Sequence, residues 1–258
     1  FNTAVGNVAG TAVTTGIKNT LIGSHAGDAI TTGGEHTAVG YSALSAEDTE
    51  SGSTAVGKSA LAVQNGATYN TAVGHSSGAV VTTGSQNTLI GYNAGVKVTT
   101  AGYATAIGYA SLGSNAAETT GNYNTALGRA TMNQVTSGTQ NTVAGYVSGA
   151  KLTTSSYNTA MGSQSLYYTT TGHSNLAMGY LAMYGEDGAT MTGHHNVALG
   201  REALKVNTTA FRNVAVGSQS LMANTTGNYN TAVGYGSLTT QSGDANYNTA
   251  VGYYAGEE

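Results

Sequence analysis

The chain has 258 residues, of which 8% are charged, and its formal net charge is -4. It contains no Cys, which excludes disulfides and thiolate metal sites. The 8 Lys and Arg form no basic cluster, so nucleic acid is not an expected partner. Apolar runs are too short to span a bilayer, and no membrane insertion of this segment is expected.

A repeat of the form Asn-Thr-Ala-Val-Gly runs through the whole chain, with 38 Gly and no Pro in the sequence. It occurs in fifteen copies, and eleven of the fourteen steps between copies are 17 residues. We number each copy so that the Asn is position 1 and the marker glycine is position 5. No linker interrupts the copies, which predicts a single repetitive domain over residues 1–258. Because the chain begins within a repeat, we interpret it as a piece of a longer chain.

Each copy predicts the same elements in chain order. Positions 1 to 4 form a short strand, as in 2–5, and the glycine makes a corner. Positions 6 to 9 form a second short strand, and a polar turn rich in Thr, Ser and Gly closes the unit. Two longer units, around 113–120 and 185–192, predict loops that protrude from the stack. The fold class is therefore all-β, a parallel β-solenoid of about fifteen coils with seventeen residues each.

Stacking of the coils places equivalent residues in columns. The Asn column predicts a ladder of side-chain hydrogen bonds, and the glycine column predicts a positive φ or a close backbone approach. The ladder comprises Asn2, Asn19, Asn70, Asn87, Asn124, Asn141, Asn158, Asn175, Asn196, Asn213, Asn230 and Asn248.

The two faces of the first strand have different predicted roles. Position 4 is apolar in every copy and is expected inside the coil, together with position 2. Position 3 is then expected to point outward, although it is Ala, Leu or Val in all copies. One interpretation is that a thin coil buries Ala on both faces. The interpretation we favour is packing between chains in a closed, three-fold homo-oligomer, through Ala38, Ala55, Ala72, Ala106, Ala126, Ala160, Ala215 and Ala232.

Runs such as Asn230-Thr231-Ala232-Val233-Gly234-Tyr235 resemble repeats of phage tail fibres and bacterial surface adhesins, including the head of trimeric autotransporter adhesins. The adhesin head repeat is shorter, near ~14 residues. The resemblance implies a homotrimeric fibre, an extracellular location on a virion or a bacterial surface, and attachment to a host glycan or protein receptor. We therefore expect a structural and adhesive fibre segment that is not an enzyme.

Two alternatives stay open. A tailspike domain that processes polysaccharide would use paired carboxylates, and Glu186 and Asp187 are the residues to test. A subunit that polymerises end to end would use the unpaired strand edges of the terminal coils. The acids are otherwise scattered, and the adjacent His194 and His195 favour no metal site, so no catalytic residue, metal or cofactor is predicted.

Tyrosine has the most informative placement among the polar aromatic residues. Seven of 17 Tyr follow the marker glycine, and six precede position 1. Tyr combines a flat apolar ring with a polar hydroxyl, which suits contact with sugars or proteins; the rings can equally cover corners and seams. The predicted receptor or carbohydrate contacts are Tyr69, Tyr103, Tyr123, Tyr157, Tyr229 and Tyr247.

Overall fold

The computed structural model describes residues 1–115, 117–185, 189–241, 243 and 245–257. The described residues contain fifteen three-residue strands and no helix. The strands are β1 (Thr3–Val5), β2 (Thr20–Ile22), β3 (Thr37–Val39), β4 (Thr54–Val56), β5 (Thr71–Val73), β6 (Thr88–Ile90), β7 (Thr105–Ile107), β8 (Thr125–Leu127), β9 (Thr142–Ala144), β10 (Thr159–Met161), β11 (Leu176–Met178), β12 (Val197–Leu199), β13 (Val214–Val216), β14 (Thr231–Val233) and β15 (Thr249–Val251).

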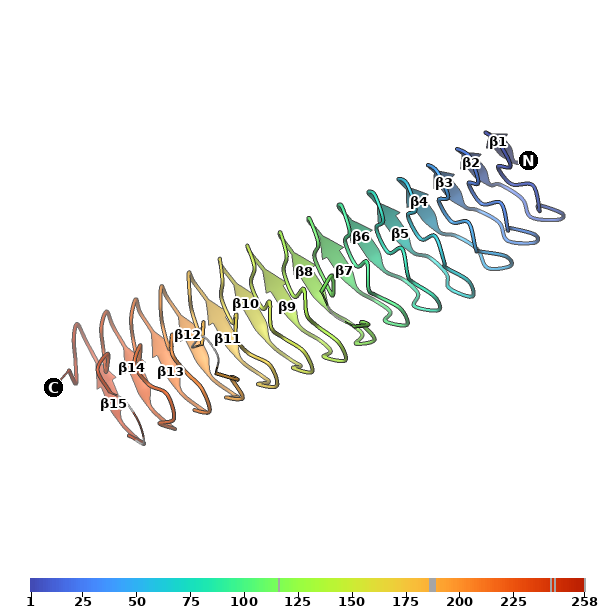
Figure 1. Ribbon diagram of the computed structural model, residues 1–258. Coiled ribbons are helices and arrows are strands. Elements are labelled where there is room, and N and C mark those ends of the chain that lie inside the picture. Colours follow the sequence, from blue (N-terminus) through green and yellow to red (C-terminus); the bar gives the residue numbers. More distant parts are fainter. Residues whose placement is uncertain (116, 186–188, 242, 244, 258) are drawn as a thin grey trace. The chain divides into compact units, whose positions relative to one another are not determined.

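The chain forms two compact units, Phe1–Leu127 with β1 to β8 (unit 1) and Gly128–Glu258 with β9 to β15 (unit 2). Within each unit the chain winds from one strand to the next, and successive strands lie side by side (Figure 1). Pairing is parallel and in register, so that Thr37, Ala38 and Val39 lie opposite Thr54, Ala55 and Val56. The predicted parallel β-solenoid is thus confirmed for each unit, whereas a single domain over the whole chain stays a prediction.

The expected second strand was wrong. Positions 6 to 9 form turns, because positions 7 and 9 take left-handed backbone conformations, with φ of 50° at Ser42 and 52° at Leu44. The backbone still bonds from coil to coil: the Leu44 N–H donates to the Ala60 carbonyl at 3.0 Å, and the Ser59 N–H to the Tyr41 carbonyl at 2.8 Å. These inter-coil bonds replace a ladder and satisfy backbone groups that lie against the core.

The marker glycine satisfies both conditions expected of it. At Gly57 φ is +132°, and a Cβ built there would lie 2.5 Å from the Gly74 carbonyl oxygen in the next coil. A side chain is therefore excluded by the backbone conformation and by the close approach of the coils.

The asparagine column forms hydrogen bonds along each unit. In unit 2, Asn213 donates from Nδ2 to Asn196 Oδ1 at 3.2 Å, and its backbone N–H donates to the same oxygen at 3.0 Å. Its Nδ2 also donates to the Gly227 carbonyl at 2.8 Å. The ladder therefore joins side chain to backbone as well as side chain to side chain.

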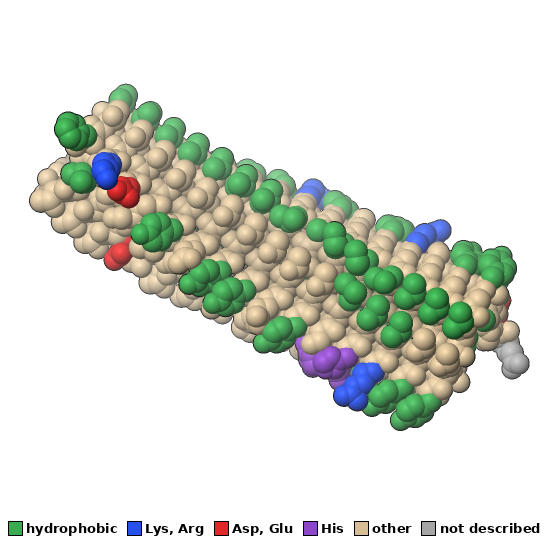
Figure 2. Space-filling view, turned by 180° about the vertical axis from the view of Figure 1, so that it is seen from behind, with side chains coloured by type: hydrophobic (Ala, Val, Ile, Leu, Met, Phe, Trp, Pro, Cys, Tyr) green, Lys and Arg blue, Asp and Glu red, His purple; other side chains and the backbone are tan. Residues whose placement is uncertain are grey.

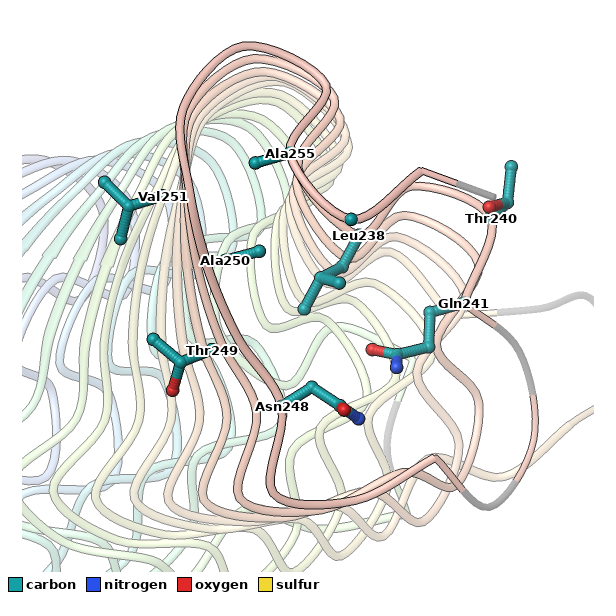
Figure 3. A pocket seen from close by; sticks show the side chains of 9 residues that line it. Leu238, Thr240, Gln241, Asn248, Thr249, Ala250, Val251 and Ala255 are labelled. Carbon is teal, nitrogen blue, oxygen red and sulfur yellow. The ribbon is translucent and has the colours of Figure 1, made fainter.

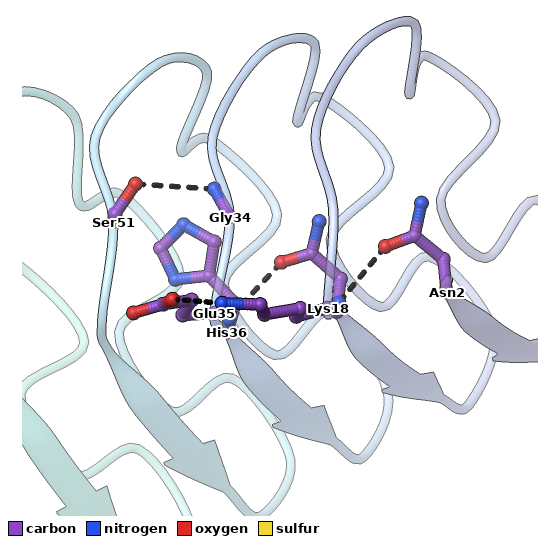
Figure 4. A network of polar contacts seen from close by, with 7 residues as sticks. Asn2, Lys18, Gly34, Glu35, His36 and Ser51 are labelled. Carbon is purple, nitrogen blue, oxygen red and sulfur yellow. Dashed lines mark hydrogen bonds and ion pairs between the residues drawn. The ribbon is translucent and has the colours of Figure 1, made fainter.

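In unit 1 the column contains His36, which replaces Asn without breaking the chain of bonds (Figure 4). The Asn19 side chain accepts from the His36 backbone N–H at 3.0 Å. The His36 ring accepts from the Ser53 N–H through Nδ1 at 3.2 Å, and its Nε2 lies 2.7 Å from the Glu50 carbonyl oxygen. The proton therefore belongs on Nε2, and the imidazole copies the acceptor and donor of an asparagine amide.

The core of the coils is a thin layer filled by positions 3, 8 and 9, and position 12 adds buried side chains such as Ile30 and Val81 in many of them. Where position 3 is Leu, position 9 is Gly: a Cβ on Gly95 would lie 2.7 Å from Leu89 Cδ2, and one on Gly27 would lie 2.8 Å from Leu21 Cδ2. Where position 3 is Ala, as at Ala38, position 9 is usually a fully buried Leu or Met. One large side chain from either wall therefore fills the same space.

Candidate binding surfaces

The outward face of the strands carries position 4, which corrects the predicted orientation. The eight Ala expected to contact another chain are each 0% exposed inside the coil: Ala38, Ala55, Ala72, Ala106, Ala126, Ala160, Ala215 and Ala232. The physical reason is space, since a coil this thin accepts Ala at position 3, or Leu only opposite glycine. The rejected interpretation, burial of this column within one chain, is the one that the structure supports.

Position 4 consequently forms an apolar column at the surface, which we call the aliphatic stripe. Eight of its fifteen side chains are 37–70% exposed and the others are half-buried, and every one is Val, Ile, Leu, Met or Ala. The position 2 residues, mostly Thr, flank it on the same face. The stripe thus presents no charge over eight strands of unit 1 and seven of unit 2.

The six tyrosines predicted as contacts are exposed, from 37% at Tyr229 to 77% at Tyr247. Four of them stack in pairs, Tyr103 on Tyr123 with ring centroids 4.9 Å apart, and Tyr229 on Tyr247 at 5.0 Å. In each pair the stacking covers one face of each ring. Tyr69 and Tyr157 stack on no ring among the described residues, and they are 63% and 60% exposed.

Unit 2 also carries an aromatic row that the sequence analysis missed. The rings of His173 and His194 are 4.9 Å apart and inclined by 19°, and those of His194 and Phe211 are 5.2 Å apart and inclined by 4°. Histidine side chains gather beside a basic residue and hydrophobic side chains on the face drawn in Figure 2. The three residues each lie two places before position 1, so aligning the copies at the marker glycine would have found this column.

The electrostatics of this row follow from its packing. Burial lowers the pKa of the His173 imidazole, and the neighbouring His194 and His195 rings lower it further. Arg212 lies over the rings of Phe211 and Tyr229, at 5.9 and 5.6 Å from their centroids, and donates to the Tyr229 hydroxyl at 2.8 Å. The described residues contain no group of three or more His, Cys, Asp or Glu arranged to hold a metal ion.

The acidic residues give no paired-carboxylate site that can be described. Glu186 and Asp187, the residues named for a polysaccharide-processing alternative, lie outside the described residues. Glu202 is 7% exposed, and the hydrogen bond from Gln219, followed by that from Lys205, lowers the pKa of its carboxyl group. Glu202 is therefore a fixed anion with a structural role.

Two hollows occur on unit 2 of the described chain. The larger, about 620 Å³, is the coil interior open beside β15; Leu238, Gln241, Asn248, Ala250 and Ala255 are among the residues that line it (Figure 3). These are the same columns that fill the core elsewhere. The smaller, about 360 Å³, lies on the surface and is lined by Thr154, Ser156, Tyr157, Thr171 and His173; we call it the ring slot.

The fold and its columns define a β-solenoid repeat protein. Comparison of the chain with models of known families, with curated proteins and with solved structures found no match. No helix with the length and apolar character needed to cross a membrane occurs among the described residues.

Proposed function

We propose that this chain is a structural and adhesive segment of an extracellular fibre, in which copies of the chain pack side by side through the aliphatic stripe. One observation carries the proposal: position 4 faces outward in every coil and is never polar. A surface column that faced only water would be expected to include Ser, Lys or Glu among fifteen copies. Contiguous exposed apolar surface instead marks an interaction site.

A second copy of the chain is the partner that fits this stripe. The stripe repeats once per coil, at about the 4.8 Å spacing of paired strands, and a partner must match that repeat to bury it without gaps. Another copy carries the same repeat and the same uncharged surface. Closed cyclic symmetry is the usual result of such self-association, and three chains is the arrangement that we expect.

The test is the mass of the protein in solution, measured by multi-angle light scattering over a range of concentrations. The wild-type chain is expected at a multiple of 25.8 kDa. The triple substitution Val39→Lys, Val56→Lys and Val73→Lys places three charges on the stripe and is expected to give the monomer mass, because unpaired charges would have to be buried at the interface.

The matched control carries three lysines on another surface column, as Tyr41→Lys, His75→Lys and Tyr92→Lys. These residues are exposed and follow the marker glycine. The control is expected to assemble as the wild type does. A monomeric wild type at every concentration, or equal dissociation of both triple variants, would contradict assembly through the stripe.

A further inference from the structure

The ring slot lies where the aromatic row of unit 2 ends. One face of the His173 ring stacks on His194 in the next coil. In the preceding coil the same column holds Ser156, whose side chain is too small to cover the other face. The hollow of about 360 Å³ therefore lies against an open ring face, with the unstacked Tyr157 on its border.

Three hydroxyl groups around the slot are available to a ligand. Among the described residues, the hydroxyls of Thr154, Thr171 and Tyr157 make no hydrogen bond. Ser156 Oγ accepts from the Thr139 N–H at 3.0 Å, and His173 Nδ1 lies 3.2 Å from Ser174 Oγ. The slot thus combines an apolar ring face with several neutral hydroxyl groups.

We propose that the ring slot binds one neutral pyranose ring of a glycan, with its C–H face on the His173 imidazole and its hydroxyls on Thr154, Thr171 and Tyr157. A pyranose has an apolar face and a rim of hydroxyls, which match these two kinds of group. No Lys, Arg, Asp or Glu lines the slot, so an ionised sugar or a phosphate would find no counter-charge. A nucleotide is disfavoured for the same reason, because nucleic acids bind chiefly through their phosphates.

This inference deepens the adhesive part of the proposed function by naming its ligand class. The slot and the aliphatic stripe use different columns, so each proposal can be wrong while the other holds. A variant that no longer assembles should still bind sugar, and a variant that no longer binds sugar should still assemble.

The experiment is saturation-transfer NMR with methyl glycosides of glucose and galactose and with the two N-acetylhexosamines, with sialic acid and adenosine monophosphate as charged probes. At least one neutral sugar is expected to bind, with a Kd of about 1 mM for a single ring in an open slot. The substitution Ser156→Phe extends the aromatic stack into the hollow and is expected to weaken binding at least tenfold. Phe211 occupies the same column, so the fold should accept the ring.

His173→Ala removes the ring face and is expected to have a similar effect. The matched control is Tyr180→Ala, which removes an exposed tyrosine of unit 2 that follows the marker glycine and does not line the slot, and it should leave binding unchanged. Circular dichroism is the check that each variant is folded. Three results would overturn the proposal: no neutral sugar binds the wild type, Ser156→Phe binds as well as the wild type, or the charged probes bind more tightly.

Discussion

The marker glycines hold adjacent coils at a distance that no other residue permits. Gly57→Ala combines a Cβ at positive φ with a contact to the Gly74 carbonyl that the backbone cannot relieve without separating the coils. We expect a loss of roughly 3 kcal/mol or more in the free energy of unfolding of unit 1. Protection of the amides of neighbouring coils from hydrogen exchange measures this loss locally, as suits a repeat structure that opens in parts.

Gly66→Ala is the control for backbone strain alone. Gly66 has φ of +85°, and the nearest atom to a new Cβ is Thr83 Cγ2 at 3.9 Å. Gly66→Ala should lower the free energy of unfolding by about 1 kcal/mol, because only the left-handed backbone conformation opposes the new side chain. Equal losses in the two variants would mean that the contact between coils at position 5 has no energetic weight.

The asparagine column is expected to stabilise unit 2 through its bonds to the backbone. Asn213→Ala leaves the buried Asn230 N–H without a partner and removes one of the two side-chain hydrogen bonds to the Gly227 carbonyl, to which Asn224 Nδ2 also donates. We expect a loss of about 1–3 kcal/mol in the free energy of unfolding, which is the cost of one unsatisfied buried group. Denaturant midpoints of this variant and of Asn115→Ala, an exposed site expected to change by less than about 0.5 kcal/mol, provide the comparison. An unchanged free energy of unfolding in Asn213→Ala would contradict the structural role of the column.

His173 predicts a loss of stability in acid. Its pKa is lowered in the folded chain, so the unfolded chain binds the proton more tightly. This contribution to stability is constant well above the unfolded pKa of about 6.5 and falls as the pH drops below it toward the folded pKa. The thermal midpoint should therefore fall less between pH 7.5 and pH 5 in His173→Asn than in the wild type. Identical pH dependence in the two proteins would remove His173 as a cause.

At the scale of the strand, the sequence determines that positions 2 and 4 share a face and that position 3 occupies the other, but alternation alone does not say which face is inside. Hydrophobicity suggested position 4, since Val and Ile are larger than Ala. The informative signal was size: Leu21, Leu89 and Val143 at position 3 each accompany a glycine at position 9 of the same copy. Compensation of volume between two columns identifies neighbours in a core, and it would have placed position 3 inside.

This compensation predicts the sign of a double-mutant cycle between Leu89 in β6 and Gly95 in the turn that follows. Leu89→Ala should cost about 2–5 kcal/mol through the cavity it leaves. Gly95→Leu alone should cost about 1–3 kcal/mol, because its side chain would overlap Leu89. In the double variant the new Leu enters the cavity, as Leu44 and Leu61 do opposite Ala in their own coils. Denaturant midpoints should show that the double variant is more stable than Leu89→Ala alone, and additive losses would refute the shared space.

The conformation of positions 6 to 9 could not be predicted from residue type. Ser42, Leu44 and Leu61 all take positive φ, although none belongs to the residue types that favour it. Bonds between coils and burial of the side chains impose this conformation, and these depend on the completed stack rather than on local sequence. The aromatic row depends on the stack in the same way, because His173, His194 and Phe211 are separated by 21 and 17 residues.

At the scale of the whole molecule, repetition made the fold predictable. Equivalent residues recur at a constant step, and translation along a parallel stack is the arrangement that gives all copies the same environment. The strands, their parallel pairing and the asparagine and glycine columns therefore followed from spacing. The binding surfaces followed less well, because the ring slot arises where one copy has Ser156 in place of a ring.

The scarcity of charge predicts how assembly responds to salt. The chain has 8 basic and 12 acidic residues, and none of them lies at position 2 or position 4. Raising sodium chloride tenfold, to about 0.5 M, should change the dissociation constant of the oligomer by less than about threefold, because screening acts on charges that the interface lacks. Ammonium sulfate should tighten assembly, since it strengthens the burial of apolar surface. Sedimentation at graded salt separates the cases: a tenfold weakening in sodium chloride would assign the contact to charged residues elsewhere on the surface and remove the aliphatic stripe from the interface.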